Sequence, residues 1–546
     1  MTFSFLYKVR FRISLFLLLT TMLLLSCSFI NGSTASEAEN DAIEESSAGN
    51  ENASASSSSG SPSDTQAQAD APVQSNANTF LDLTEELRTS ITVDGIRQHL
   101  QAFQGIADAN NGTRASGTSG YDQSAAYVQA RLEEAGYDVT VQLFEFRFRY
   151  DASTVEQLGP SPTRYVYFDE FASLAFSPAG SAEGLLQAVG IQEPLRGDTP
   201  SGCDAAQFEG FVPGNVALVK RGICPFAEKA NNAEAAGATA MLVFNDGSES
   251  DREGVIFGGT LGDGHRGTIP VIGLSFHTGE ELYRQSLLED VRVAITVDVV
   301  DETREAVNVL ADTTAGRDDF VVVVGGHLDS VPAGPGIQDN GSGTATILEI
   351  ALQMAQLDVV PTNKVRFAFW GAEEFGLLGS RHYVEELSRT ERNNIALNLN
   401  FDMIASPNYA LFVYDGDHSA FSAASTGGAA PQGSEDIEQV FHSFFAEQGL
   451  DLKETAFDGR SDYGPFIQNG IPAGGLFSGA ESAKSRRDVT LYGGTINEAY
   501  DQCYHLPCDT IDNINWDALD VMSDAAAHTV LVFALTEKPV ADVFPD

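Results

Sequence analysis

Basic residues are scarce in this chain. Its 546 residues include 31 Lys and Arg against 77 Asp and Glu, which gives a formal net charge of −46 at pH 7. This balance excludes a basic face that binds nucleic acid, because such faces neutralise phosphates with Lys and Arg. We therefore expect no nucleic-acid partner, and a well-solvated, exported protein.

Cysteine is scarce as well, with five residues in the chain. Cys27 lies in an N-terminal leader, which leaves four: Cys203, Cys224, Cys503 and Cys508. An even number in an exported protein favours disulfides over reactive thiols, and four cysteines allow three pairings. The sequence also lacks any G-x-S-x-G stretch, which disfavours a serine hydrolase.

The leader contains an apolar run that is short for a membrane span. A basic start is followed by the largely apolar stretch Ile13–Leu25. A spanning helix needs about 20 such residues, so residues 1–27 are predicted to be a signal peptide. The leader ends in L-L-S-C, which resembles a bacterial lipoprotein box and would leave Cys27 as a lipidated N-terminus. The alternative is an ordinary signal peptide that contains a chance cysteine.

Residues 28–78 form a low-complexity tract with almost no large apolar residues. Such a composition cannot offset the entropy of ordering, so we expect a disordered tether rich in Ser, Ala and Asn. Behind a lipidated Cys27 it would hold the rest of the chain away from a membrane. The lipid anchor is the one membrane contact that we expect. The predicted location is the bacterial cell envelope, and otherwise the exterior as a secreted protein.

A run of four valines, Val321–Val324, predicts a strand buried on both faces of a sheet. It ends in two glycines, and His327 and Asp329 follow at once. Asp339 stands twelve residues after the histidine, ahead of an apolar helix expected at 344–357. Ligands of α/β folds bind at the carboxyl ends of strands, and imidazole with carboxylate is metal-ligand chemistry.

Three more groups of possible ligands follow along the chain. A second apolar strand is expected at 365–370 and leads to Glu373 and Glu374, and a third at 395–401 leads to Asp402. His505 lies further on, between Cys503 and Cys508. Four such groups, most of them just past strand ends, predict a metal centre rather than a solvated surface.

These residues resemble the co-catalytic di-zinc aminopeptidase family, which includes secreted and vacuolar aminopeptidases. The resemblance rests on G-G-H-x-D, D-N-G-S-G, W-G-A-E-E-x-G-L-x-G-S, N-x-D-M and C-Y-H-x-x-C-D-T. It covers roughly residues 85–150 and 302–535. It implies an α/β fold with a mixed, mostly parallel central sheet flanked by helices, in two chain segments, 79–158 and 302–546.

The resemblance implies two Zn²⁺ per chain, with a ligand at every expected position. Asp339 would bridge the two ions. His327 and Asp402 would complete one site, and Glu374 and His505 the other.

The same resemblance assigns roles to four further residues. Glu373 would be the general base, and Tyr504 would donate to the oxyanion, with a packed aromatic as the alternative. Asp329 would accept from the His327 imidazole and fix its tautomer. Arg460, in an R-S-D segment, would contact substrate, with a surface salt bridge as the alternative.

Residues 159–301 do not match the peptidase and are expected to form an inserted domain. Within them a strand at 216–219, a helix at 225–236 and a strand at 240–244 resemble the small, β-rich protease-associated (PA) domain. This insert is expected to carry no catalytic residue. The two resemblances imply the disulfides Cys203–Cys224 and Cys503–Cys508, and the alternative makes Cys503 and Cys508 zinc thiolates.

The globular part opens with two helices, expected at 93–103 and 121–135, and a strand at 137–148. Between the helices lies R-x-x-G-T-x-G-Y, which starts at Arg114 and is also found in the family, where it is usually structural.

The function expected from these observations is that of an exported zinc aminopeptidase. It would hydrolyse the N-terminal bond of peptides that have a free N-terminus, by a metal-bridging hydroxide with Glu373 as general base. The alternatives are a zinc carboxypeptidase or glutaminyl cyclase on the same fold, or a non-catalytic surface receptor that bears a PA domain.

Overall fold

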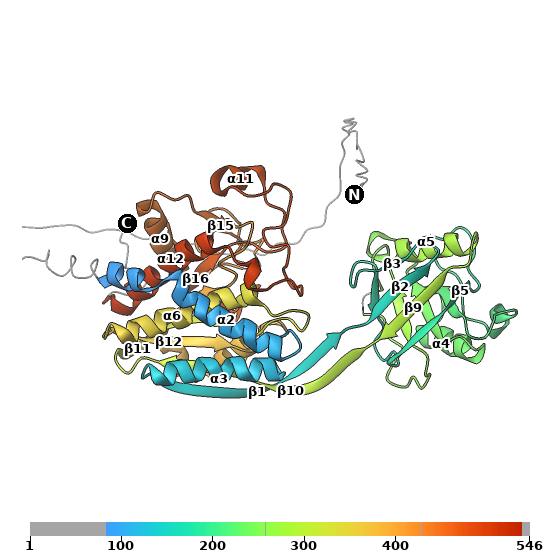
Figure 1. Ribbon diagram of the computed structural model, residues 1–546, viewed down its shortest axis with the longest axis horizontal. Helices are drawn as coiled ribbons and strands as arrows, with labels where there is room; N and C mark the ends of the chain where they lie inside the picture. Colours follow the sequence, from blue (N-terminus) through green and yellow to red (C-terminus); the bar gives the residue numbers. More distant parts are fainter. Residues whose placement is uncertain (1–82, 257, 427, 538–546) are drawn as a thin grey trace, which may run out of the picture. The chain divides into compact units, whose positions relative to one another are not determined.

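The computed structural model describes residues 83–256, 258–426 and 428–537 (Figure 1). The predicted signal peptide with Cys27 and the whole predicted tether therefore lie outside the described residues. The described strands form two eight-stranded sheets.

The first sheet is built from segments on both sides of the insert. Its strands, in spatial order, are β1 (Asp138–Asp151), β10 (Val299–Asp312), β12 (Asn363–Trp370), β11 (Arg317–His327), β13 (Ile395–Phe401), β16 (Ala473–Phe477), β14 (Phe412–Tyr414) and β15 (Lys453–Thr455). Neighbours from β12 to β16 are parallel, whereas the β1–β10, β10–β12 and β14–β16 pairs are antiparallel. The expected mixed, centrally parallel sheet is thus confirmed.

Strand β11 is covered on both faces, which explains its unbroken run of valines. Val322 and Val324 belong to the large core on one face of the sheet, and Val321 and Val323 to the core on the other face. All four are buried. Successive side chains of a strand point to opposite faces, so a strand between two layers needs an apolar residue at every position.

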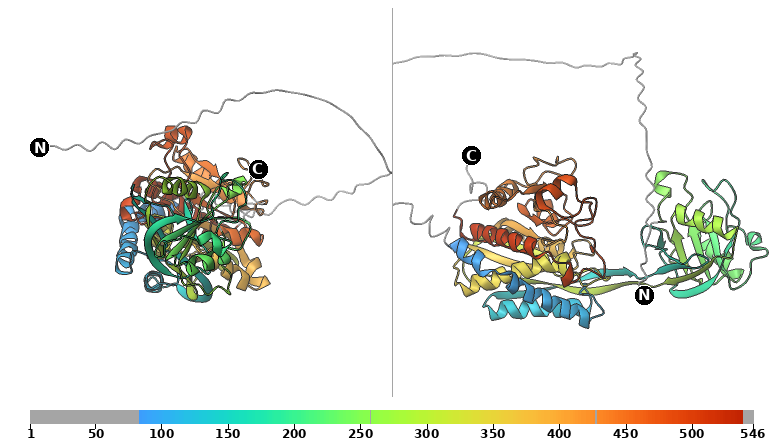
Figure 2. Two further views of the ribbon diagram at one scale, coloured as in Figure 1. Left: turned by 90° about the vertical axis from the view of Figure 1, so that its right-hand side faces the viewer. Right: turned by 45° about the horizontal axis from the view of Figure 1, so that its top comes forward.

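Helices cover both faces of this sheet (Figure 2). The larger core receives side chains from α2 (Val93–Ala109), α3 (Ser119–Glu134), α6 (Gly343–Gln356), α9 (Ser434–Glu447) and α12 (Trp516–Leu535). The opposite face is packed by α7 (Leu378–Glu386) and α10 (Tyr463–Gln468). Two further short helices in this part are α8 (Arg389–Asn394) and α11 (Arg486–Tyr492). The helices expected around 93–103, 121–135 and 344–357 are confirmed as α2, α3 and α6.

Helix α12 is, among the described residues, the one helix with the length and composition to cross a membrane. In the structure, 72% of the most apolar 18-residue stretch of this helix is buried. It packs in the large core of the first sheet, as the central helix of a soluble domain does.

The second sheet is formed by the insert together with the residues just before it, from Thr154, and has cores of its own. Its strands, in spatial order, are β3 (Thr163–Arg164), β2 (Thr154–Gly159), β9 (Arg292–Val297), β5 (Gly180–Ala188), β6 (Val216–Lys220), β7 (Ala240–Phe244), β8 (Val271–Leu274) and β4 (Phe171–Ser173). Its helices are α4 (Phe226–Ala235) and α5 (Phe276–Ser286). The expected strand, helix and strand are β6, α4 and β7, and β6 pairs with β7 in parallel.

Candidate metal centre and substrate pocket

The candidate ligands gather at the carboxyl ends of three adjacent parallel strands. His327 is the last residue of β11, Asp402 directly follows β13, and Glu374 lies in the loop after β12. Asp339 belongs to an irregular helical turn ahead of α6, and His505 to the loop that follows α11. Parallel strands end at one edge of a sheet, which is where α/β folds place their sites.

The carboxylate of Asp339 lies between the two histidines. Its Oδ1 is 3.2 Å from His327 Nε2, and its Oδ2 is 3.2 Å from His505 Nε2. Asp402 Oδ1 is also 3.2 Å from His327 Nε2, and Glu374 Oε2 is 3.1 Å from His505 Nε2. Two groups of nitrogen and oxygen donors therefore share one carboxylate.

This donor set fits divalent cations. In each group the candidate ligand atoms lie within 4.8 Å of one another. Imidazole with carboxylate is a donor set typical of zinc. Glu374 Oε1 is buried and has no hydrogen-bond partner among the described residues, which is costly for an anionic oxygen unless a cation faces it.

The electrostatics of the site point the same way. Burial acts to raise the pKa of Asp339, but hydrogen bonds from His327 and His505 bring it below its ordinary value. Burial raises the pKa of Glu373 well above its ordinary value, and that of Asp329 to about 8. The carboxylates outnumber the imidazoles that face them, so the site is short of positive charge.

Glu373 lies beside the same group of donors. Its Oε2 is 3.9 Å from His327 Nε2, and its main-chain N donates to Asp329 Oδ1 at 3.2 Å. The preceding Ala372 has a left-handed φ of 54° and donates its N–H to Ser116 Oγ at 2.7 Å. The turn therefore directs the two adjacent glutamates differently.

Asp329 contacts His327 in another way than the sequence suggested. The carbonyl oxygen of Asp329 is 3.1 Å from His327 Nδ1, whereas its carboxylate Oδ1 is 3.8 Å away. The carboxylate instead accepts the Glu373 N–H. Asp329 thus contacts both a candidate ligand and the candidate base.

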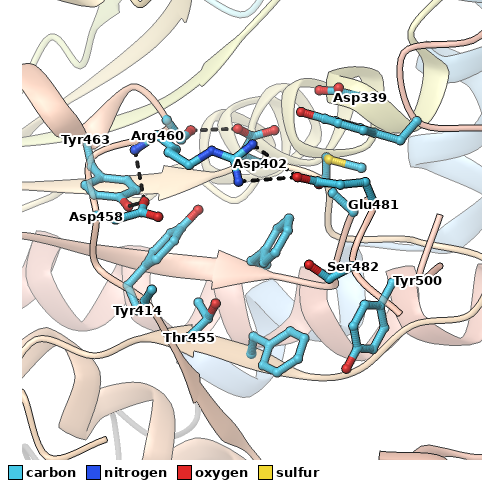
Figure 3. A pocket seen from close by; sticks show the side chains of 18 of the residues that line it. Asp339, Asp402, Tyr414, Thr455, Asp458, Arg460, Tyr463, Glu481, Ser482 and Tyr500 are labelled. Atoms are coloured by element: carbon cyan, nitrogen blue, oxygen red, sulfur yellow. Dashed lines mark hydrogen bonds and ion pairs between the residues drawn. The ribbon is translucent and has the colours of Figure 1, made fainter. Parts of the chain in front are cut away.

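A cavity of about 670 Å³ opens beside the candidate ligands (Figure 3). Its walls combine charged side chains, among them Lys453, Glu454, Asp458 and Glu481, with large apolar and aromatic ones: Met403, Phe412, Tyr414, Phe421, Phe477 and Tyr500. Such a mixed pocket of apolar and polar groups is typical of a substrate site.

Arg460 and Tyr504 also line this cavity. Both terminal nitrogens of Arg460 are 3.4 Å from Glu481 Oε1, an exposed ion pair that Figure 3 shows beside Asp402. The ring of Tyr504 stacks on that of His505 with centroids 3.8 Å apart, and burial raises its pKa. The ion pair of Arg460 is the surface salt bridge that was its alternative role, although the residue also lines the cavity. The roles of Arg460 and Tyr504 in binding and catalysis stay predictions.

The cysteine pairs are Cys203–Cys224 in the insert and Cys503–Cys508 around His505. The alternative that made Cys503 and Cys508 zinc ligands is wrong, because their sulfurs are bonded to each other. Cys503 and Cys508 are five positions apart, so the second disulfide closes a short loop that contains His505.

Three buried residues around the site had no role assigned from the sequence. Ser461 Oγ donates to Asp402 Oδ2 at 2.6 Å, and the Asp462 side chain is fully buried. Asp509 accepts from the main-chain N–H groups of Gln338 and Asp339. All three stand inside the sequence motifs named above, and their place in those motifs is the feature of the sequence that could have pointed to them.

Two family models match the chain: peptidase family M28 at residues 308–530 and the PA domain at residues 188–282. An aminopeptidase of Pseudomonas aeruginosa is 42% identical over 454 residues, 83% of each chain. The probable lipoprotein aminopeptidase LpqL of Mycobacterium tuberculosis is 41% identical over 449 residues, 82% of this chain and 86% of the relative.

A solved structure has the same fold. The aminopeptidase from Aneurinibacillus sp. strain AM-1 superposes with a TM-score of 0.51 at 23% identity, over 84% of this chain and 97% of that one. With this fold, the two family matches and relatives above 40% identity along most of their length, the chain belongs to peptidase family M28 and carries an inserted PA domain.

Proposed function

We propose that this M28 peptidase is an exported, zinc-dependent enzyme that releases N-terminal residues from peptides. Its class as a metallo-aminopeptidase agrees with the family and with the names of its relatives. The observation that carries the proposal is the carboxylate of Asp339, which faces His327 with one oxygen and His505 with the other.

Two zinc ions would have separate sets of ligands apart from Asp339. His327 and Asp402 would hold one ion, and Glu374 and His505 the other. When bound, zinc would polarise the scissile carbonyl and make an adjacent water more acidic.

The surrounding side chains would handle the proton and the developing charge. Glu373 would take the proton of the attacking water and return it to the leaving amine, because its carboxylate lies beside the candidate ligands, with Oε2 3.9 Å from His327 Nε2. The Tyr504 hydroxyl would donate to the carbonyl oxygen as it becomes negative. Arg460, beside Glu481 in the cavity wall, would contact the peptide, and Asp329 would hold His327 and the Glu373 turn.

The substrate would be a peptide with a free α-amine. The acidic groups around the site offer acceptors for an ammonium group, whereas a neutral amide would forgo this attraction. The apolar walls of the cavity would receive the first side chain. Relatives named aminopeptidase support this reading over a carboxypeptidase, a glutaminyl cyclase or a receptor.

The proposal includes the location and the division of the chain. The L-L-S-C box, a relative named a probable lipoprotein and two disulfides support an exported lipoprotein anchored at Cys27. The peptidase domain would comprise 79–158 and 302–546, and the PA domain 159–301.

The test combines metal analysis with a set of matched peptides. We expect about two zinc ions per chain in active enzyme, and loss of activity with a chelator. One peptide is prepared in three forms: with both ends free, with the N-terminus acetylated, and with the C-terminus amidated. We expect the enzyme to cleave the unblocked and the amidated forms and not the acetylated form. Cleavage of the acetylated but not the amidated peptide would mean that the enzyme acts at the other end.

A further inference from the structure

A fully buried arginine lies beside the loop that joins two candidate metal ligands. Arg114 starts the R-x-x-G-T-x-G-Y segment after α2, and none of its surface is exposed. Burial lowers its pKa to about 10, so the guanidinium is still charged at neutral pH. A buried cation is costly unless its donors are satisfied, so its partners define its role.

The guanidinium of Arg114 donates to main-chain carbonyls at both ends of one loop. Nη1 donates to Leu328 O at 2.5 Å, Nε to Pro335 O at 2.8 Å, and Nη2 to Gly336 O at 2.5 Å. Leu328 directly follows His327. One side chain therefore ties the start of the loop, next to this ligand, to its end.

At the far end of the loop, two main-chain N–H groups donate to the carboxyl group of one residue. Asp509 is buried and accepts from Gln338 N at 2.8 Å and from Asp339 N at 3.0 Å. Asp509 comes four residues after His505, so its own loop carries another candidate ligand. Residues 328–339 are thus fixed between a guanidinium that donates to carbonyls and a carboxyl group that accepts from N–H groups.

We propose that Arg114 is a positioning residue for metal binding, which holds the 328–336 loop so that His327 and Asp339 meet one ion. The inference rests on the proposed metal centre. The segment between the two ligands contains two prolines and two glycines and little regular structure, so without Arg114 it would gain conformational freedom that metal binding must remove. Lysine cannot replace it, because a single ammonium group cannot match the fork that reaches three carbonyls.

The test compares Arg114→Lys with a matched control, Arg366→Lys. Arg366 also makes a bidentate contact, at 2.6 Å to Asp312, but its partner lies at the end of β10 rather than in the ligand loop. Zinc dissociation constants are measured by competition with a chromophoric chelator. The geometry of the metal sites is followed by the visible absorption of the Co²⁺-substituted proteins. We expect at least one site of Arg114→Lys to weaken ~10–100-fold with a changed Co²⁺ spectrum. Arg366→Lys should bind both metals like the wild type.

Wild-type zinc affinity and an unchanged Co²⁺ spectrum in folded Arg114→Lys would overturn the inference, even with a lowered Tm. If that variant does not fold, Ser330→Ala tests the same loop more gently. Ser330 Oγ accepts from Arg114 N at 3.0 Å and donates to Gly334 O at 2.9 Å. We then expect a smaller loss of zinc affinity than that expected for Arg114→Lys. Unchanged zinc affinity would also overturn the inference. A wild-type protein that binds no ion would contradict the proposed function itself, and this role of Arg114 with it.

Discussion

Glu373 and Glu374 are adjacent in the chain, yet their side chains have different surroundings. Glu374 Oε2 faces His505 at 3.1 Å, whereas Glu373 Oε2 is 3.9 Å from His327 and its N–H is held by Asp329. The left-handed φ of Ala372 begins the turn that separates them. A base and a ligand can therefore occupy consecutive positions.

This difference predicts two distinct losses. Glu373→Gln should keep both metals but lower kcat by ~10²–10⁴-fold, because it removes proton transfer and little substrate binding. Glu374→Gln should lower metal content together with activity. Metal analysis and steady-state kinetics on both variants check this. Near-normal turnover of Glu373→Gln would place the base elsewhere.

A second residue-scale prediction concerns acid stability. Burial opposes ionisation of Asp488, but hydrogen bonds from Lys453, Ser485 and Tyr500 lower its pKa to about 2. An unfolded Asp has a pKa of about 3.9. A depressed folded-state pKa stabilises the protein above the unfolded pKa, and that contribution is lost as the pH falls from about 4 to about 2.

Asp488→Asn should therefore lower the free energy of unfolding at pH 7, by at most about 2.5 kcal/mol, and flatten its decline below pH 4. Urea unfolding at pH 7, 4 and 3 measures both effects. Asp251→Asn, an exposed carboxylate in the insert, is the control and should change neither. A decline in Asp488→Asn as steep as in the wild type would contradict this account.

At the scale of elements, the two disulfides close loops of very different length. Cys203 and Cys224 are 21 residues apart, and Cys503 and Cys508 only five. The stabilisation expected from restricting the unfolded chain grows with loop length. The short disulfide matters more for its position, because it encloses His505 and directly precedes Asp509.

The paired variant Cys503→Ser/Cys508→Ser should therefore lose metal affinity and kcat more than it loses stability. Cys203→Ser/Cys224→Ser should lower the Tm of the insert and leave zinc binding nearly unchanged. Thermal unfolding and zinc titration of the two double variants separate these outcomes. Equal zinc affinity in both would mean that the short disulfide does not hold His505.

On the scale of the whole molecule, metal binding should be coupled to the stability of the peptidase domain. A ligand that binds only the folded state stabilises it by about 4 kcal/mol at a concentration 1,000 times its Kd. The site joins three central strands to two loops, so removal of zinc should lower the Tm of that domain. Differential scanning calorimetry with and without chelator checks this, and re-added zinc should restore the Tm. An unchanged Tm would mean that metal binding at this site does not stabilise the peptidase domain.

Anchoring is the second prediction at this scale. The protein expressed in a bacterial host should partition into detergent, and Cys27→Ala should abolish this partitioning. Neighbouring Ser26→Ala keeps the cysteine and should still partition. A mature protein that starts beyond Cys27 with no lipid, as found by mass spectrometry, would reject the anchor.

The sequence by itself determined the fold class and the residues that gather at the site. The valine run of β11 needs burial on both faces. Because β11 ends in His327 and the neighbouring strands end shortly before Glu374 and Asp402, these residues must meet at one edge of a parallel sheet. These features are local in the chain, because side-chain period and polar residues at strand ends can be read directly from it.

Only the tertiary structure decided which atoms meet. Arg114 reaches a loop more than 200 positions further along the chain, and Asp509 accepts from N–H groups some 170 positions before it. The contact of Asp329 with His327 through its carbonyl likewise depends on the path of the loop. Such contacts join segments with no regular spacing between them, and their geometry is fixed by the packing of the whole sheet and its helices rather than by any local pattern.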